Sequence, residues 1–414
     1  MRRNRLCPAA LISLIAAILS GCGGGGTTTY SDPPIYTRAE AMQHGAWTIL
    51  VYLDADNDLE AAGITNFNQM ELAGSTRNRR VIVQMDRKDG NDPDNESWTD
   101  TRRYLIIRDP DACVMHSIRL DDEPLGELDM GDWQTLQDFV EWAVAEFPAD
   151  HYCLIIWDHG TGWQIRGAVV APEYKYVVID ETSGNAMNVT EIPGALTRVN
   201  IEVVAFDACL MQQLETAYQL RHSASYMVGS AAPEPAPGYN YSGFLQGVNA
   251  ATTCEQLCRL IVQQYAVAYP PPTRSITQSA LDLSAIDDVA DAVSALAEVL
   301  MDNAATYAAA LAQARELSLN YSTLVGCPQR HSIDLRNYAA GCASFLGPDA
   351  ETALANLSTA MDAALIAETH NPDTSTAHGL AIYLPDPSSY SARYDFLDLA
   401  ADTWWDDWIR SQPQ

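Results

Sequence analysis

Apolar-rich runs that end at an aspartate recur along the first half of this chain, and helical stretches separate them. The runs lie at 47–53, 80–86, 151–157 and 201–206. Stretches with helical periodicity lie between them, at about 59–72, 136–147 and 190–199. Such runs are typical of buried parallel strands. Strands that alternate with helices predict an α/β fold, in which helices cover both faces of a mainly parallel sheet.

Two short polar segments follow predicted strands in this first half. Asp158-His159-Gly160 comes directly after 151–157, and Asp207-Ala208-Cys209 comes directly after 201–206. In parallel sheets, functional groups gather at the carboxyl ends of the strands. We therefore expect His159 and Cys209 to lie at the same edge of the sheet.

This pair of residue types predicts nucleophilic catalysis. A helix is expected to follow Cys209 to about residue 224, and a thiol at a helix N-terminus is favoured as thiolate. His159 could take the thiol proton and later protonate a leaving amine. The backbone N–H groups of Gly160 and Cys209 could form an oxyanion hole. The alternatives are an inert buried thiol and a capping histidine.

The N-terminus is predicted to be a targeting segment. Arg2, Arg3 and Arg5 precede an apolar stretch at 6–19 that is too short for an ordinary transmembrane span. Leu19-Ser20-Gly21-Cys22 resembles a bacterial lipobox. Residues 1–21 are then a lipoprotein signal peptide, Cys22 carries the lipid, and residues 22–45 form a flexible tether. A plain signal peptide is the alternative. The expected location is the bacterial cell envelope, at the outer membrane or cell surface.

Charge and cysteine content narrow the classes of partner. The chain has 24 basic and 54 acidic residues, a net charge of -30. Nucleic acid and anionic bilayers would repel it, so membrane attachment is expected through the lipid alone.

Of nine cysteines, seven remain after Cys7 and Cys22 are set aside. An odd number leaves at least one free thiol. The cysteine spacings match no zinc site, and no metal ligand set is assigned.

Four segments together resemble the clostripain family of cysteine peptidases, which is related to caspases, gingipains and legumain. They are WTILVYLDADNDLE from Trp47, the stretch from Met130 that contains FPADHYCLIIWDHGTGW, FDACLMQQLE from Phe206, and GSAAPEPAPGYNY from Gly229. The resemblance implies a caspase-like α/β/α sandwich over residues 46–250 and a catalytic dyad of His159 and Cys209. Residues 251–414 contain Ala-rich helical stretches, the longest at 285–317, and two further predicted strands at 275–283 and 379–384. This region is expected to complete or flank the sheet as a C-terminal helical extension.

The resemblance also implies a substrate class and a route of activation. Family members typically cleave after Arg or Lys, so the expected substrates are proteins or peptides with basic residues. Asp207 matches the family's pocket aspartate, and Glu234 is the nearby acid in the second pocket segment. Either could instead be structural. Members are often activated by a cut between the His and the Cys, for which Lys175 is the preferred position. The alternatives are another P1 preference, transpeptidase activity, or an inactive surface binding protein.

The acidic residues outside these motifs are given structural roles. Asp54, Asp56 and Asp58 lie close together, but they lack the glycine and distal glutamate of an EF-hand loop. They are expected to form the turn and the N-cap at the start of the first helix. Asp180 and Glu181 are expected to be loop charges. No organic cofactor is implied, and calcium is left open because some members of the resembled family depend on it.

Overall fold

The computed structural model describes residues 32–88, 95–163, 177–271, 275–325 and 331–412. A nine-stranded sheet has the order β12-β10-β9-β8-β5-β1-β2-β3-β4. Its strands are β1 (Gly45–Ala55), β2 (Arg79–Arg87), β3 (Arg102–Leu105), β4 (Ile118–Arg119), β5 (Ala149–Trp157), β8 (Val203–Asp207), β9 (Tyr226–Gly229), β10 (Thr277–Asp282) and β12 (Leu365–His370). The central strands β2, β1, β5, β8 and β9 pair in parallel, and the outer strands pair antiparallel.

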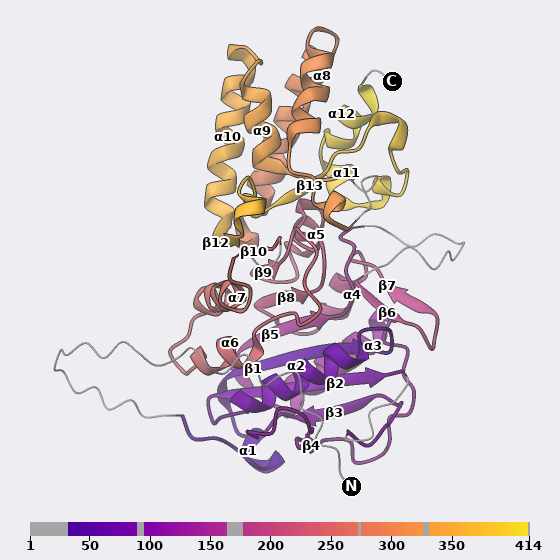
Figure 1. Ribbon diagram of the computed structural model, residues 1–414, viewed down its shortest axis with the longest axis vertical. Coiled ribbons are helices and arrows are strands. Elements are labelled where there is room, and N and C mark those ends of the chain that lie inside the picture. The colour runs from indigo at the N-terminus through magenta and orange to yellow at the C-terminus, as the bar shows by residue number, and fades with distance from the viewer. Residues whose placement is uncertain (1–31, 89–94, 164–176, 272–274, 326–330, 413–414) are drawn as a thin grey trace, which may run out of the picture.

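Helices cover both faces of this sheet (Figure 1). Along β1, Leu50 and Tyr52 enter one core while Ile49 and Val51 enter the other, as the two-residue period of a strand requires. The first core includes side chains of α3 (Trp133–Glu146), α4 (Ile192–Leu196), α5 (Leu214–Leu220) and α8 (Ile286–Leu317). The second includes side chains of α2 (Glu60–Ala73), α6 (Tyr241–Gly247) and α7 (Cys254–Ala268). The predicted α/β/α sandwich is confirmed.

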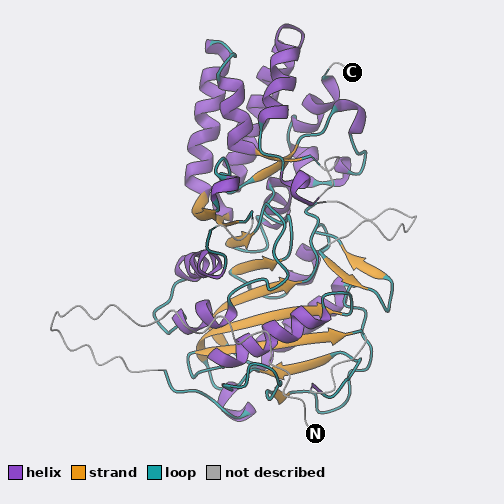
Figure 2. Cartoon of the chain, in the orientation of Figure 1, coloured by secondary structure: helices purple, strands orange, loops and turns teal. Residues whose placement is uncertain are grey.

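The C-terminal region divides its residues between the sheet and a helical lobe. β10 and β12 extend the sheet beyond β9, so the sheet includes strands that follow residue 250, the predicted end of the catalytic domain. Figure 2 shows most strands in one half of the molecule and the long C-terminal helices in the other. The lobe contains α8, α9 (Leu335–Ala343), α10 (Pro348–Ala364), α11 (Asp398–Asp402) and α12 (Trp405–Ser411). β11 (Ser332–Asp334) and β13 (Ala381–Tyr383) form a separate two-stranded sheet.

The flexible tether predicted for residues 22–45 does not include residues 32–45, the part of it that the structure describes. Residues 32–45 pack on the domain and include the short helix α1 (Arg38–Ala41). Ile35 is fully buried, and Pro34 forms an antiparallel bridge with Thr76. The Asp32 carboxylate accepts a hydrogen bond from the Asn78 side chain at 3.0 Å. The burial of Ile35, an isolated apolar residue in a polar stretch, overrides the Gly-, Thr- and Pro-rich composition that suggested a tether.

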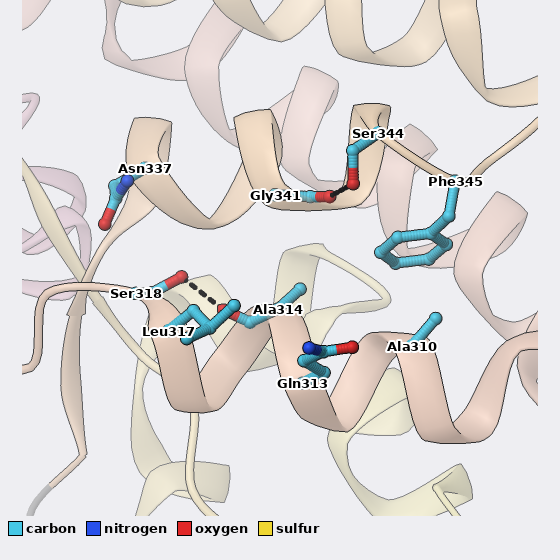
Figure 3. A pocket seen from close by; sticks show the side chains of 9 residues that line it. All are labelled: Ala310, Gln313, Ala314, Leu317, Ser318, Asn337, Gly341, Ser344 and Phe345. Atoms are coloured by element: carbon cyan, nitrogen blue, oxygen red, sulfur yellow. Dashed lines mark hydrogen bonds between the residues drawn. The ribbon is translucent and has the colours of Figure 1, made fainter.

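No helix among the described residues is long and apolar enough to span a bilayer. A cavity of about 230 Å³ lies between α8 and α9 (Figure 3). Small, apolar and neutral polar side chains line it, including Ala310, Leu317, Asn337, Gly341 and Phe345. It has no titratable side chain in its lining and contains neither His159 nor Cys209. The candidate site is therefore sought at the strand ends.

Candidate active site

His159 and Cys209 lie at the same edge of the sheet. β5 and β8 are parallel neighbours, and Trp157 is the register partner of Asp207. His159 and Cys209 each lie two residues beyond these partners. β1 pairs with the other side of β5, although the next strand in the chain, β2, lies on the far side of β1. The sheet order thus reverses between β1 and β5, and crevices of this kind are where α/β sheets bind ligands.

Gly160 brings the two segments into backbone contact. A Cβ atom at residue 160 would lie 2.1 Å from the Cys209 carbonyl oxygen and 2.8 Å from its nitrogen. Any side chain there would therefore push the two loops apart. The Gly160 N–H donates no hydrogen bond within the described part of the chain.

Cys209 does not sit at a helix N-terminus, contrary to our expectation. α5 begins at Leu214, and residues between Cys209 and this helix are extended or turned. Leu210 has a positive φ of 63°. Its N–H donates to Ala232, the Gln212 N–H donates to Ser230, and the Gln212 carbonyl accepts from the Ala381 N–H. This tertiary hydrogen bonding holds the segment extended, and local propensity could not reveal it.

The Cys209 thiol instead contacts the backbone of Glu234. The Glu234 N–H donates to the Cys209 sulfur at 3.1 Å, and the Glu234 carbonyl lies 3.8 Å from it. A backbone N–H aimed at sulfur favours the thiolate, because hydrogen bonding to a charged form stabilises that form. The thiol is half-buried. The backbone of loop 230–234 thus provides the stabilisation of the thiolate that we had expected from a helix dipole.

Asp58 contacts His159, the candidate base. From the sequence we had expected Asp58 only near the start of α2. The His159 Nε2 atom lies 2.6 Å from the Asp58 Oδ1 atom. The histidine side chain is 17% exposed and the aspartate side chain 74%. Asp58 follows β1, the neighbour of β5, so strand adjacency is the signal that could have suggested this contact.

Asp207 and Glu234, the predicted pocket acids, lie together next to Cys209. Asp207 is buried and accepts hydrogen bonds from the Tyr239 N–H at 3.1 Å and the Tyr241 hydroxyl at 2.8 Å. Gly238, which has a positive φ of 60°, lets the loop approach the Asp207 carboxylate. Glu234 is half-buried, yet both carboxylate oxygens are inaccessible and accept no hydrogen bond from a donor group among the described residues. The Glu234 side chain shares a hydrogen bond with the Asp207 carboxylate.

Burial changes the ionisation of both acids. It raises the pKa of Asp207 to about 6, against the opposing hydrogen bonds from the Glu234 side chain, the Tyr239 N–H and the Tyr241 hydroxyl. Burial, followed by the charge of Asp207, raises the pKa of Glu234 well above its usual value. Glu234 is therefore the member of the pair that holds a proton more readily, and it can donate that proton to the Asp207 carboxylate. We call Asp207 and Glu234 the S1 pair.

A second acidic group lies at the end of β1, and we call it the β1-end cluster. It consists of Asp54, Asp56, Glu127 and Asp180. Asp180 is fully buried, so our expectation of a loop charge was wrong. Its carboxylate accepts hydrogen bonds from the Met130 and Ser183 N–H groups, at 2.8 and 2.7 Å.

The cluster has the ligand chemistry of a hard cation. Oxygen atoms of Asp56, Glu127 and Asp180 all lie within 4.8 Å of one another. Burial, followed by the hydrogen-bonding neighbour Asp180, raises the pKa of Asp56 to about 7. Carboxylate oxygens at this spacing suit Ca²⁺, so these three residues are the ones that could hold it. The predicted turn is confirmed, because Asp54 accepts the Asp56 N–H at 3.0 Å. The predicted N-cap is wrong, because the N-cap of α2 is Leu59 and no side chain caps the helix there.

The remaining predicted positions are the cysteine thiols and the residues that lie outside the described segments. Cys153, Cys209, Cys254, Cys258 and Cys342 are free, so the prediction of at least one unpaired thiol is confirmed. Burial raises the pKa of the Cys153 and Cys258 thiols, which makes them poor nucleophiles. The lipid site Cys22, the signal peptide and Lys175 lie outside the described residues.

Comparisons with known proteins agree with this architecture. The family model described as the clostripain family matches residues 51–411. Clostripain from Hathewaya histolytica is 28% identical over 230 residues, which are 49% of this chain and 42% of that protein. The match thus covers less than half of that relative's length.

Two solved structures share the fold. A secreted C11 cysteine protease from Bacteroides thetaiotaomicron, in complex with an irreversible peptide inhibitor, superposes with a TM-score of 0.64 at 20% identity, covering 88% of this chain and 99% of that one. An inactive zymogen C11 protease from Parabacteroides distasonis gives a TM-score of 0.62 at 20% identity, covering 87% and 98%. The family match extends over most of the chain, and the chain belongs to the clostripain family of cysteine peptidases.

Proposed function

We propose that this protein is a cysteine endopeptidase that cleaves peptide bonds after Arg or Lys with a dyad of Cys209 and His159. The observation that carries the proposal is the position of these residues at the ends of adjacent strands, with Gly160 in backbone contact with Cys209. Among the other described thiols, Cys153, Cys258 and Cys342 are buried. Cys254 lies 3.7 Å from His151 Nδ1, but this pair is at the start of β5, at the opposite edge of the sheet, and burial raises the pKa of the Cys254 thiol to about 11. Cys209 is half-buried and hydrogen-bonded by a backbone N–H, which suits a reactive thiolate.

The reaction would follow the general route of acyl transfer. The Cys209 sulfur attacks the scissile carbonyl carbon after His159 has taken the thiol proton. The N–H groups of Gly160 and Cys209 stabilise the oxyanion of the tetrahedral intermediate. His159 then donates its proton to the leaving amine, and the C–N bond breaks to leave a thioester. Water, deprotonated by His159, hydrolyses the thioester and restores the thiol.

The S1 pair supports a basic residue at P1. Asp207 is a buried carboxylate, and the Glu234 carboxyl that shares a hydrogen bond with it accepts none from a donor group in the described residues. A guanidinium or ammonium group would hydrogen-bond both carboxyls and favour the ionised form of Glu234. A neutral side chain would leave the pair without a counter-charge, so the discrimination is electrostatic.

The location and activation of the enzyme follow from segments outside the described residues. A lipid on Cys22 would anchor the protein in the bacterial envelope, at the outer membrane or cell surface. Cleavage after Lys175, between His159 and Cys209 in the sequence, would open the connecting segment. The substrates would then be extracytoplasmic proteins or peptides with basic residues.

The test is hydrolysis of a P1-varied fluorogenic peptide library by protein that lacks residues 1–22. Wild type and Cys209→Ala are compared, each with and without added calcium. Cleavage after Arg or Lys that Cys209→Ala abolishes would support the whole proposal. Cleavage at another P1 would keep the dyad but refute the role of the S1 pair. No cleavage by either protein, and no labelling of Cys209 by a thiol-directed peptide inhibitor, would refute the peptidase.

A further inference from the structure

We propose that Asp58 is a positioning residue for His159, so that the dyad works as a Cys–His–Asp set. The inference rests on the proposed function, in which His159 is the base. Its basis is the 2.6 Å contact between the Asp58 Oδ1 atom and the His159 Nε2 atom. A carboxylate at this distance accepts the Nε2 proton and determines the tautomer of the ring.

The fold places Asp58 at this position through two ties. The Asn57 side chain donates to the Asp158 carboxylate at 2.7 Å and to the Ile179 carbonyl at 3.2 Å. The Asp56 carboxylate accepts from the Thr182 N–H at 2.9 Å. These contacts join the β1–α2 turn to the segment that precedes His159 and to the β6 (Val178–Asp180) region. The turn is therefore held beside the base, and Asp58 projects from it.

The chemical consequence is a defined division of labour between the ring nitrogens. With the proton of Nε2 directed at Asp58, Nδ1 is the nitrogen that has a lone pair. Nδ1 is then the atom that takes the Cys209 proton. The same carboxylate stabilises the imidazolium that forms, as an orienting acid does in other nucleophile–base pairs. Because Asp58 is 74% exposed, solvent moderates this stabilisation.

Other acids near His159 have contacts of their own. The Asp158 carboxylate accepts the His159 backbone N–H, and the Glu234 backbone contacts the Cys209 sulfur. The Asp56 carboxylate accepts the Thr182 N–H. The Asp58 carboxylate contacts the imidazole ring itself.

The experiment compares Asp58→Asn and Asp58→Glu with wild type. Asp58→Asn keeps the size of the side chain and removes the charge. We expect kcat/KM to fall roughly 10-fold, mainly through kcat. The limb of the pH profile that reports imidazolium deprotonation should move to lower pH by roughly half to one unit, because the carboxylate favours the charged ring. Asp58→Glu should restore part of the rate, since an exposed longer side chain can still reach Nε2.

The molecule offers a matched control in His44 and Asp150. Their side chains are 61% and 64% exposed, and the His44 Nε2 atom lies 2.9 Å from the Asp150 Oδ1 atom. Asp150 is near the start of β5, whereas His159 follows its end. Asp150→Asn therefore removes a similar pair at the opposite edge of the sheet, and we expect unchanged kinetics.

Two readouts separate this inference from the peptidase proposal. Nitrogen-15 NMR of labelled histidines reports which ring nitrogen of His159 carries the proton, with the signal assigned by its loss in His159→Gln. Iodoacetamide alkylation of Cys209 against pH reports the thiolate without any peptide. An Nε2 proton that Asp58→Asn redistributes supports the inference even if wild type cleaves no peptide. Unchanged tautomer, pH profile and rate in Asp58→Asn would overturn it, whether or not the protein is a peptidase.

Discussion

The S1 pair and the β1-end cluster are both groups of acids at the same edge of the sheet, mostly buried apart from the exposed Glu127, yet they are built differently. In the β1-end cluster, Asp56 and Asp180 accept hydrogen bonds from backbone N–H groups of Thr182, Ser183 and Met130. In the S1 pair, neither carboxylate oxygen of Glu234 meets a donor within the described residues. Asp54 Oδ2 in the β1-end cluster also lacks a donor in the described residues, so the difference is one of degree. Backbone loops hold Asp56 and Asp180, whereas Glu234 hydrogen-bonds Asp207.

This difference indicates where a cationic substrate would bind. Two buried carboxyls side by side cost stability when both ionise, and a bound cation would offset that cost. The Glu234 carboxyl adjoins Asp207, and the Glu234 backbone contacts the Cys209 sulfur, so a bound cation would lie beside the nucleophile. The loops around Asp56 and Asp180 depend on those carboxylates for their own shape. We therefore expect substitutions in the S1 pair to change mainly the activity, and substitutions in the β1-end cluster to change mainly the stability of the protein.

The largest expected effect is on cleavage after basic residues. Glu234→Gln and Asp207→Asn should each lower kcat/KM for Arg or Lys substrates on the order of 100-fold, because each removes a buried charge partner of the P1 side chain. Peptides with a neutral P1 should lose little. The measurement is the ratio of kcat/KM for matched basic and neutral peptides. Asp56→Asn serves as the control and should leave this ratio within about twofold, since its carboxylate lies in the other group. Equal losses for all three variants would remove the distinction between the groups.

A smaller effect is expected on the pH dependence of specificity. Burial raises the pKa of Asp207 to about 6, so the pocket loses its negative charge as pH falls through that value. The preference for basic over neutral P1 should therefore rise roughly tenfold between pH 5 and pH 7. Taking the ratio of two substrates cancels the ionisation of Cys209 and His159, which affects both. A ratio that stays constant over this range would contradict the role of Asp207.

The smallest expected effect is on the stability of the folded protein, through the β1-end cluster. Burial raises the pKa of Asp56 to about 7, above its value in the unfolded chain. The folded state then binds more protons, and the contribution of Asp56 to stability is lost as pH rises from about 4 through about 7. Asp56→Asn should remove this dependence and raise the Tm at pH 8 by roughly 1–3 °C. Thermal unfolding at pH 5 and pH 8 measures it, and Glu234→Gln provides the comparison. A lower Tm for Asp56→Asn at both pH values would mean that its hydrogen bonds outweigh its charge.

The strands of the fold could be predicted from the sequence because their signals are local. Predicted runs at 47–53 and 151–157 correspond to β1 and β5, and the long helix expected at 285–317 is α8. Buried parallel strands require uninterrupted apolar segments, and such segments can be read without knowing their neighbours. The run at 379–384 was less informative. It forms β13, which pairs with β11 outside the main sheet, and only the packing of the C-terminal lobe decides that.

The site was predictable where motif and strand end coincide. His159 and Cys209 were identified because each follows a predicted strand, and parallel strands must present their carboxyl ends together. The environment of the thiol was not predictable. The extended segment after Cys209 is held by Ser230, Ala232 and Ala381, which are distant in sequence. Asp58 was missed because its partner is more than 100 residues away.

By itself, then, the sequence determined the α/β class, the order of strands and helices, and the residue types at the strand ends. Those follow from periodicity and from short-range chemistry. Tertiary structure alone decided which strands became neighbours, and with them the contacts of Asp58 with His159 and of Glu234 with Cys209. It also decided which acids lost water and so acquired raised pKa values, among them Asp56 and Asp207. The physical reason is that hydrogen-bond partners and desolvation depend on distances between segments, which the order of residues does not contain.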